Sequence, residues 1–164
     1  MIIDVFVEIP KGSRNKYEYD KERHVIKFDR MLFSSVQYPT DYGFIPETLG
    51  LDGDPLDALV LLGEPTFPGC LIETRPIGVF CMRDDKGQDE KILSVPLQDP
   101  QWNHLKKLKD VPPHLLKEIE HFFSVYKELE GKKVQVQGWK DKTQAEKVIK
   151  DCAARYLRKK SPKS

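Results

Sequence analysis

The sequence predicts a mainly β protein of the α+β class, in which a closed or half-closed β-barrel precedes flanking C-terminal helices. Two observations support this prediction. Short apolar segments of extended character, separated by Gly, Pro and Asp turns, fill roughly the first 95 residues. After Asp99-Pro100 the apolar residues recur at helical spacing instead. Because many short strands with frequent turns are typical of small barrels, we expect the helices to pack on the outside of a barrel.

Six segments of the N-terminal part are expected to be strands. They are 2–9, 16–20, 24–29, 58–63, 75–82 and 91–97. A further strand, 132–139, is expected between the two helices.

The two expected helices have recognisable ends. The first covers 111–131, with prolines at its start and Gly131 at its end. The second covers 143–160 and begins with a capping box from Thr143 to Glu146. One face of the second helix is apolar and should pack on the barrel; it comprises Ala145, Val148, Ile149, Cys152, Tyr156 and Leu157.

Length and charge narrow the class of protein. A chain of 164 residues is expected to form a single domain, 1–164, with a core of its own. The basic tail from about residue 158 is expected to be frayed. Because 27 basic residues balance 26 acidic ones, no overall basic field exists to attract nucleic acid or a membrane. Function is therefore expected to depend on local charge.

Three further features indicate a cytoplasmic protein. The N-terminal segment has no signal-peptide pattern, because Asp4 and Glu8 interrupt its apolar residues. No segment approaches the uncharged span that a membrane helix needs. The three cysteines are odd in number and form no CxxC pair, which favours a reducing compartment.

Three carboxylates lie within six residues, in the stretch DGDPLD. Asp52, Asp54 and Asp57 are joined there by a glycine and a proline, a composition that an exposed turn would also explain. The stretch leads directly into the apolar run 58–62, however, and a second acidic group, 84–91, also joins two strand-like segments. Two acidic rims on one barrel indicate a shared site.

Carboxylates held close together must take up protons or bind cations, and an all-oxygen cluster suits Mg²⁺, Mn²⁺ or Ca²⁺. A calcium-binding loop counted from Asp52 fails, because Leu56, Asp57 and Gly63 occupy positions that require other residues. Cations that retain water can generate hydroxide at neutral pH. The expected substrate is therefore rich in phosphate.

Basic and phenolic side chains near the same segments could bind that phosphate. The basic ones are Lys16, Arg30, Lys91 and Lys127, each of which would by default be a solvated surface charge. The phenolic ones are Tyr38, Tyr42 and Tyr126, which donate to phosphate only if they face the metals. His24, His104, His114 and His121 show no ligand spacing and receive no role.

Four segments, 8–20, 38–60, 75–91 and 121–132, carry motifs that together resemble the family I soluble inorganic pyrophosphatases, including the signature D-x-D-P-x-D. The resemblance covers nearly the whole chain, except that the last helix and the tail are generic. It implies a barrel of the oligonucleotide-binding (OB) type and hydrolysis of pyrophosphate to two phosphates by a Mg²⁺-activated hydroxide. It also implies several Mg²⁺ ions per site, with Mn²⁺ or Zn²⁺ as substitutes, and a cytoplasmic homohexamer of the prokaryotic type.

The resemblance further implies a role for each matching residue. The metal ligands would be Asp52, Asp57, Asp84, Asp89 and Glu18. The base that activates water would be Asp54. The substrate-binding residues would be Lys16, Arg30, Tyr38, Lys91, Tyr126 and Lys127. Supporting residues would be Glu8, Tyr42 and Asp85, the last with a weaker role.

Two other functions remain open at this level. A hydrolase of longer polyphosphates or nucleotides would use the same chemistry, although the chain has no Walker-type loop and no GxGxxG motif. A small barrel could instead bind single-stranded nucleic acid. The carboxylate-rich rims oppose that function, because they would repel a phosphate backbone unless metal were bound.

Overall fold

The computed structural model describes residues 1–162. In chain order the strands are β1 (Ile3–Ile9), β2 (Asn15–Asp20), β3 (Val25–Met31), β4 (Asp41–Phe44), β5 (Asp57–Val60), β6 (Leu71–Asp84), β7 (Gly87–Pro96) and β8 (Gln135–Asp141). The helices are η1 (Leu108–Asp110), α1 (Pro113–Val125), η2 (Glu128–Glu130) and α2 (Lys142–Lys160), of which η1 and η2 are short 3₁₀ turns.

Five strands form a closed ring. The larger sheet has the order β1-β4-β5-β7-β6-β8, and β1 also pairs with β6 from Ile3↔Thr74 to Phe6↔Leu71. The β5–β7 pair is parallel, whereas the other pairs of the ring are antiparallel. The predicted OB-like barrel is therefore confirmed, and β8 extends it beyond β6.

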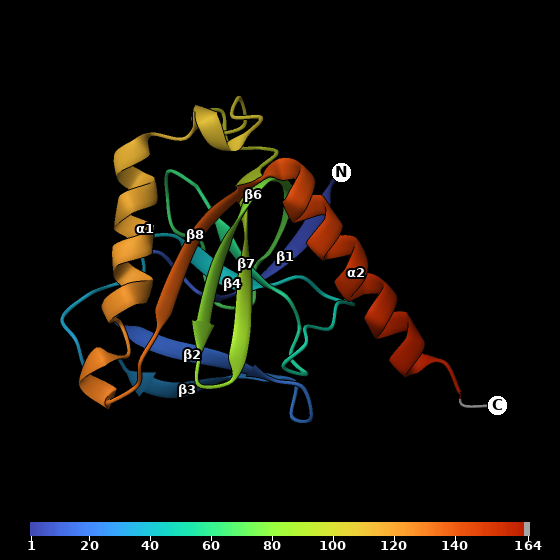
Figure 1. Ribbon diagram of the computed structural model, residues 1–164, viewed down its shortest axis with the longest axis horizontal. Coiled ribbons are helices and arrows are strands. Elements are labelled where there is room, and N and C mark those ends of the chain that lie inside the picture. The colour runs from blue at the N-terminus through green and yellow to red at the C-terminus, as the bar shows by residue number, and fades with distance from the viewer. Residues whose placement is uncertain (163–164) are drawn as a thin grey trace.

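Strands β2 and β3 form a separate two-stranded sheet. They lie at the end of the barrel where the β6–β7 hairpin turns (Figure 1). The β2–β3 hairpin thus closes one side of that barrel end, and side chains of β2 line a pocket together with residues of β5 and β7.

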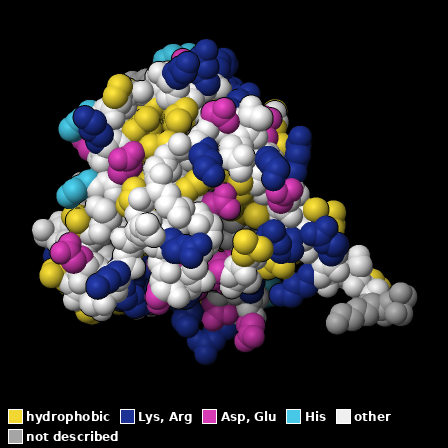
Figure 2. All heavy atoms as spheres, viewed as in Figure 1, with side chains coloured by type: hydrophobic (Ala, Val, Ile, Leu, Met, Phe, Trp, Pro, Cys, Tyr) yellow, Lys and Arg dark blue, Asp and Glu magenta, His cyan; other side chains and the backbone are white. Residues whose placement is uncertain are grey.

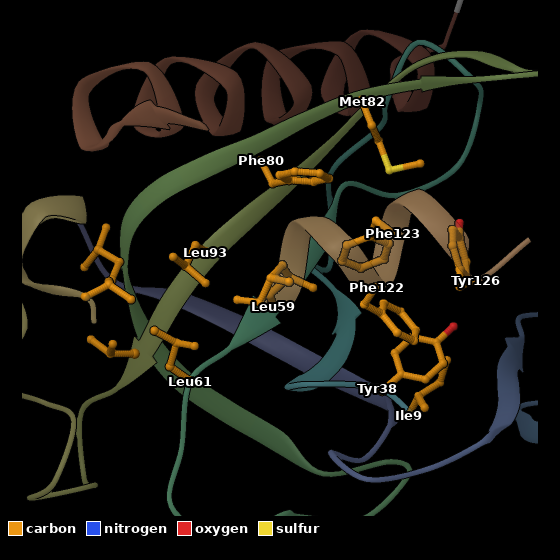
Figure 3. Packing of buried hydrophobic residues seen from close by; sticks show 14 of the residues in the cluster. Ile9, Tyr38, Leu59, Leu61, Phe80, Met82, Leu93, Phe122, Phe123 and Tyr126 are labelled. Carbon is orange, nitrogen blue, oxygen red and sulfur yellow. The ribbon is translucent and has the colours of Figure 1, made fainter. Parts of the chain in front are cut away.

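Helix α1 covers one flank of the barrel through aromatic side chains. Phe122 lies 4.7 Å from Tyr38 and Phe123 lies 5.5 Å from Phe80, measured between ring centroids. Figure 3 shows Phe122 and Phe123 projecting from α1 into this cluster. Full burial of each such side chain contributes about 2 kcal/mol to stability. The aromatic contacts therefore hold the end of α1, and with it Tyr126, against the barrel.

Helix α2 packs on the opposite flank (Figure 1). Its buried residues are Ala145, Val148, Ile149 and Cys152. They share a core cluster with Val79 and Ile92 of the barrel. Leu157, which was predicted to belong to this face, is 62% exposed, because the last turns of α2 project beyond the barrel.

The structure corrects three local predictions. No strand was predicted at Asp41–Phe44, yet β4 pairs there with both β1 and β5. The first long helix ends at Val125 rather than at 131, and η2 follows it. The capping box of α2 is wrong: the side chain of Asp141 accepts the cap hydrogen bond from the Gln144 amide at 3.0 Å, so Thr143 lies inside the first turn.

The tail and the surface complete the description. Helix α2 continues through Lys160 and so includes the first residues of the tail that was expected to be frayed, whereas 163–164 lie outside the described residues. Basic and acidic side chains alternate over the face shown in Figure 2, in keeping with the net charge of +1. Across residues 1–162, none of the helices is both long and apolar enough to cross a membrane.

We expect Gly43→Ala to lower the free energy of unfolding by about 2 kcal/mol. An added Cβ at Gly43 would overlap the carbonyl oxygen of Phe6 and lie 2.9 Å from the Cα of Val7, and backbone atoms of paired strands cannot move aside. Urea denaturation monitored by circular dichroism measures the loss. Gly63→Ala is the control, because the atoms nearest its Cβ all belong to the side chains of Gln101 and Asp99, which can move aside. Equal losses in the two variants would contradict the argument.

Candidate active site

A pocket of about 180 Å³ opens at the barrel end beside the β2–β3 hairpin. It collects residues from both halves of the sequence, and every predicted site residue except Arg30 and Asp85 lines it. Those lining residues are Glu8, Lys16, Glu18, Tyr38, Tyr42, Asp52, Asp54, Asp57, Asp84, Asp89, Lys91, Tyr126 and Lys127.

Strand register brings the central residues together. Asp57 begins β5 and pairs with Lys91 on the parallel strand β7. Asp89 precedes Lys91 by two residues on the same strand, so both side chains point to the same face. Tyr42 lies on β4, the other neighbour of β5. The second acidic group is thus part of a hairpin, with Asp89 inside a strand rather than in a loop.

The ammonium group of Lys91 lies at the centre of the site. Its Nζ lies 2.9 Å from a carboxylate oxygen of Asp57, 3.1 Å from one of Asp89 and 3.1 Å from the Tyr42 hydroxyl. It also lies 5.0 Å from the ring centroid of Phe123. The side chain is 1% exposed, so the charge is compensated by these carboxylates rather than by water.

Burial changes the protonation of this cluster. Burial alone would lower the pKa of Lys91, but Asp57 and Asp89 raise it well above its usual value. Burial raises the pKa of Asp89, although Lys91 opposes the shift. Burial also raises the pKa of Glu8 to about 7, although this carboxylate accepts a hydrogen bond from the Tyr19 amide at 2.8 Å. At Asp89 and Glu8 the effect of burial therefore outweighs the contacts that oppose it.

Asp52 and Asp54 are carried by a tight turn at the mouth of the pocket. The Gly50 amide donates to the Asp54 carbonyl at 2.7 Å, and the Asp54 amide donates to the Asp52 carboxylate at 3.0 Å. Gly53 has a φ of 89°, in the left-handed region that glycine enters without strain. The turn leaves the side chains of Asp52 and Asp54 exposed, at the edge where a substrate would enter.

Each of three further basic side chains is paired with a carboxylate. Lys127 lies 3.5 Å from Asp84, and burial lowers the pKa of Lys127 although Asp84 opposes the shift. Asp29 bridges Lys16 at 3.2 Å and Arg30 at 2.6 Å. Lys16 and Lys127 thus line the same pocket as the carboxylate cluster, each paired with a carboxylate.

Arg30 lies beside the pocket rather than in its lining. Its guanidinium lies 2.7 Å from the carboxylate of Glu130, whose side chain is only 8% exposed. Sequence reasoning missed both Glu130 and Asp29; for Asp29 the only signal was its position next to Arg30. Asp85 is exposed in the β6–β7 turn and lies outside the pocket.

The donor set fits a hard divalent cation. Asp52, Asp57 and Asp89 supply only oxygen ligands, the type that Mg²⁺ and Ca²⁺ bind. Partial burial raises the pKa of Asp52, and burial raises that of Asp89 although Lys91 opposes the shift, so desolvation disfavours the charged form of both carboxylates. Over residues 1–162 no group of three or more His, Cys, Asp or Glu side chains already forms a metal cage. In this arrangement the Lys91 ammonium contacts both Asp57 and Asp89.

A small pocket lined by carboxylates, ammonium groups and tyrosines defines a class of protein: an enzyme that acts on phosphate groups with the help of bound cations. The comparisons with known proteins identify the family. A family model described as inorganic pyrophosphatase matches residues 5–157. The chain therefore belongs to the inorganic pyrophosphatase family, which implies a divalent metal cofactor, and the resemblance found in the sequence is confirmed.

Individual relatives support this family assignment. The chain is 64% identical over 156 residues to an inorganic pyrophosphatase of Methanosarcina mazei, which covers 95% of this chain and 92% of that protein. It is 55% identical over 157 residues to one of Streptomyces coelicolor, covering 95% and 96% of the two chains. The crystal structure of inorganic pyrophosphatase from Thermus thermophilus matches with a TM-score of 0.93 at 45% identity, covering 95% and 91% of the two chains.

We expect Lys91→Met, measured without divalent cations, to lower the free energy of unfolding by about 3 kcal/mol. The substitution leaves the carboxylates of Asp57 and Asp89 close together without their shared counter-charge. Denaturant unfolding in EDTA measures the loss. Lys147→Met is the control, because its pair with Asp151 is exposed and should contribute less than about 1 kcal/mol. A loss as small as that of the control would show that Lys91 does not stabilise the cluster.

Proposed function

We propose that this chain hydrolyses inorganic pyrophosphate to two orthophosphates with Mg²⁺ as its cofactor. One observation carries the proposal: a single pocket is lined both by carboxylates, which can hold cations, and by ammonium and hydroxyl groups able to bind phosphate. The family to which the chain belongs, and the pyrophosphatases it resembles at up to 64% identity, support this assignment.

Asp52, Asp57 and Asp89 would hold the most tightly bound cation, because their carboxylates line the same pocket. Asp84, at the end of β6, and Glu18, on β2, would contact further cations that arrive with the substrate. Several Mg²⁺ ions per site are therefore expected, with Mn²⁺ or Zn²⁺ as substitutes. Once bound, such cations lower the pKa of coordinated water and neutralise phosphate charge.

The protein's own groups have two tasks. Asp54, exposed at the mouth of the pocket, accepts the proton of the attacking water. Attack of that water on one phosphorus breaks the P–O–P bond and releases the second phosphate. The phosphate oxygens are bound by Lys16, Arg30, Tyr38, Lys91, Tyr126 and Lys127. Glu8 and Tyr42 orient the neighbouring side chains, and Asp85 has at most a peripheral role.

Pocket size favours a small substrate. The volume of about 180 Å³ lies below the roughly 300–1,000 Å³ of sites that enclose drug-sized ligands. Pyrophosphate therefore suits the pocket better than a nucleotide does. Binding of single-stranded nucleic acid is also disfavoured, because the exposed Asp52 and Asp54 would repel its backbone.

We also propose a homo-oligomer, a hexamer by resemblance, in the cytoplasm. Large apolar side chains that a second copy could cover are exposed on β3 and just after it: Val25, Phe28, Met31 and Phe33. All three cysteines are free, which suits a reducing compartment.

Phosphate release from pyrophosphate at neutral pH tests the proposed function. We expect turnover with Mg²⁺, none in EDTA, and inhibition when Ca²⁺ competes with Mg²⁺, because Ca²⁺ accepts looser coordination and acidifies water less. Tripolyphosphate and ATP serve as comparison substrates. Folded protein that releases no phosphate with Mg²⁺, or that prefers ATP, would overturn the assignment.

We expect Asp54→Asn to lower kcat by roughly 10² to 10⁴. The amide preserves the shape of the side chain but cannot accept the proton, so folding and Mg²⁺ affinity should change little. Asp4→Asn is the control, because Asp4 is exposed on β1 and lies outside the pocket. Wild-type turnover of Asp54→Asn across the pH range would remove Asp54 from the role of base.

A further inference from the structure

We propose that Arg155 of α2 is a positioning residue that anchors the acidic turn 50–54. Through this anchor the C-terminal helix controls the metal affinity of the site. Neither the motifs nor the proposed mechanism assigns a task to this helix. This inference rests on the proposed function, because it concerns the cation held by Asp52 and its neighbours.

Both backbone groups of Leu49 are bound by α2. The Leu49 amide donates to the carbonyl of Cys152 at 3.0 Å, and the Leu49 carbonyl accepts from Nη1 of Arg155 at 2.7 Å. Arg155 Nη1 also lies 3.7 Å from the sulfur of Cys152, so its side chain lies along the helix toward the loop. A residue whose two backbone groups are both held by one helix cannot move independently of that helix.

The base of the loop is closed on the barrel side. The Ile45 amide donates to the Leu56 carbonyl at 2.9 Å, and the Leu56 amide donates to the Thr48 hydroxyl at 2.9 Å. Leu56 is buried in the same core cluster as Cys152. The segment 45–56 is thus held at its base by the barrel and at Leu49 by α2.

The acidic turn follows immediately after this anchor. Gly50 is adjacent to Leu49, and its amide donates to the carbonyl of Asp54. Asp52 in turn accepts from the Asp54 amide. A shift of Leu49 would therefore displace the whole turn, including the carboxylates of Asp52 and Asp54.

Open space lies behind the acidic turn. A pocket of about 210 Å³ lies between the turn and α2, with Asp52, Asp57 and Asp89 on one side and Lys147 and Arg155 on the other. Carboxylates that repel one another tend to spread when there is room. Lys91 joins Asp57 and Asp89, whereas Asp52 lies on the turn beside the open space. The two hydrogen bonds at Leu49 tie this turn to α2 and so oppose its displacement.

The inference predicts an effect on cation binding rather than on chemistry. In Arg155→Met the stem remains, but the donor to the Leu49 carbonyl is lost. We expect the Kd for Mg²⁺, measured by calorimetry, to rise about tenfold, as when a group that orients metal ligands is removed. At saturating Mg²⁺ kcat should return to within about threefold of wild type, and Arg155→Lys, which keeps a donor, should recover part of the affinity.

Arg158→Met is the matched control, because Arg158 is exposed on the same helix and does not line the pocket beside the turn. Its Mg²⁺ affinity should equal that of wild type, and both variants should melt in EDTA within a few degrees of wild type. Unchanged Mg²⁺ affinity in Arg155→Met would overturn the inference. So would equal losses of affinity in Arg155→Met and Arg158→Met, because they would indicate a general weakening of α2.

If Arg155→Met does not fold, hydrogen exchange on the unaltered protein tests instead whether α2 holds Leu49. Protection of the Leu49 amide at the level of strand amides supports the anchor, whereas exchange as fast as that of the exposed residues 51–53 contradicts it. The outcomes are separable from those of the proposed function. Wild-type protein that releases no phosphate would overturn that function, whereas an active wild type with unchanged affinity in Arg155→Met overturns only the anchor.

Discussion

The buried ammonium of Lys91 is the interaction on which the arrangement of the site depends. It lies about 3 Å from carboxylates of Asp57 and Asp89, in an environment where its side chain is 1% exposed. A lone charge could not be buried there, because its desolvation would cost several kcal/mol. The parallel β5–β7 pairing supplies the compensation, since its register places Asp57 opposite Lys91. The register of the β5–β7 pair therefore also determines which charges compensate one another in the site.

The rest of the pocket consists of parts that differ in rigidity. Tyr38, Tyr42 and Tyr126 are packed into the aromatic core and hold their hydroxyls in place. Asp52 and Asp54 lie instead on an exposed turn, held at Leu49 by α2. Such a division would suit the proposed function: the packed tyrosines would bind phosphate, and the anchored turn would present its carboxylates to the cation. The two flanking helices thus act on different parts of the pocket.

The acidic motifs could be read from the sequence because their chemistry is local. Three carboxylates in six residues, with a glycine and a proline among them, indicate cation binding in any fold that brings them to the rim of a core. The short strand β4 could not be read in the same way. It has four residues, one of them Gly43, and it is a strand because β1 and β5 pair with it on both sides. The cap of α2 was missed for a related reason: Asp141 is the last residue of β8 as well as the cap residue.

By itself the sequence predicted the mainly β character, the barrel, the family and 13 of the 19 residues that line the pocket, because these depend on motifs whose members are close together in the chain. The tertiary structure decided which charges compensate one another. Glu130 pairs with Arg30 a hundred residues away, Lys91 lies between two carboxylates from different strands, and Arg155 holds the Leu49 carbonyl. Contacts over such separations depend on how strands and helices are placed in space, and sequence periodicity carries no information about that placement.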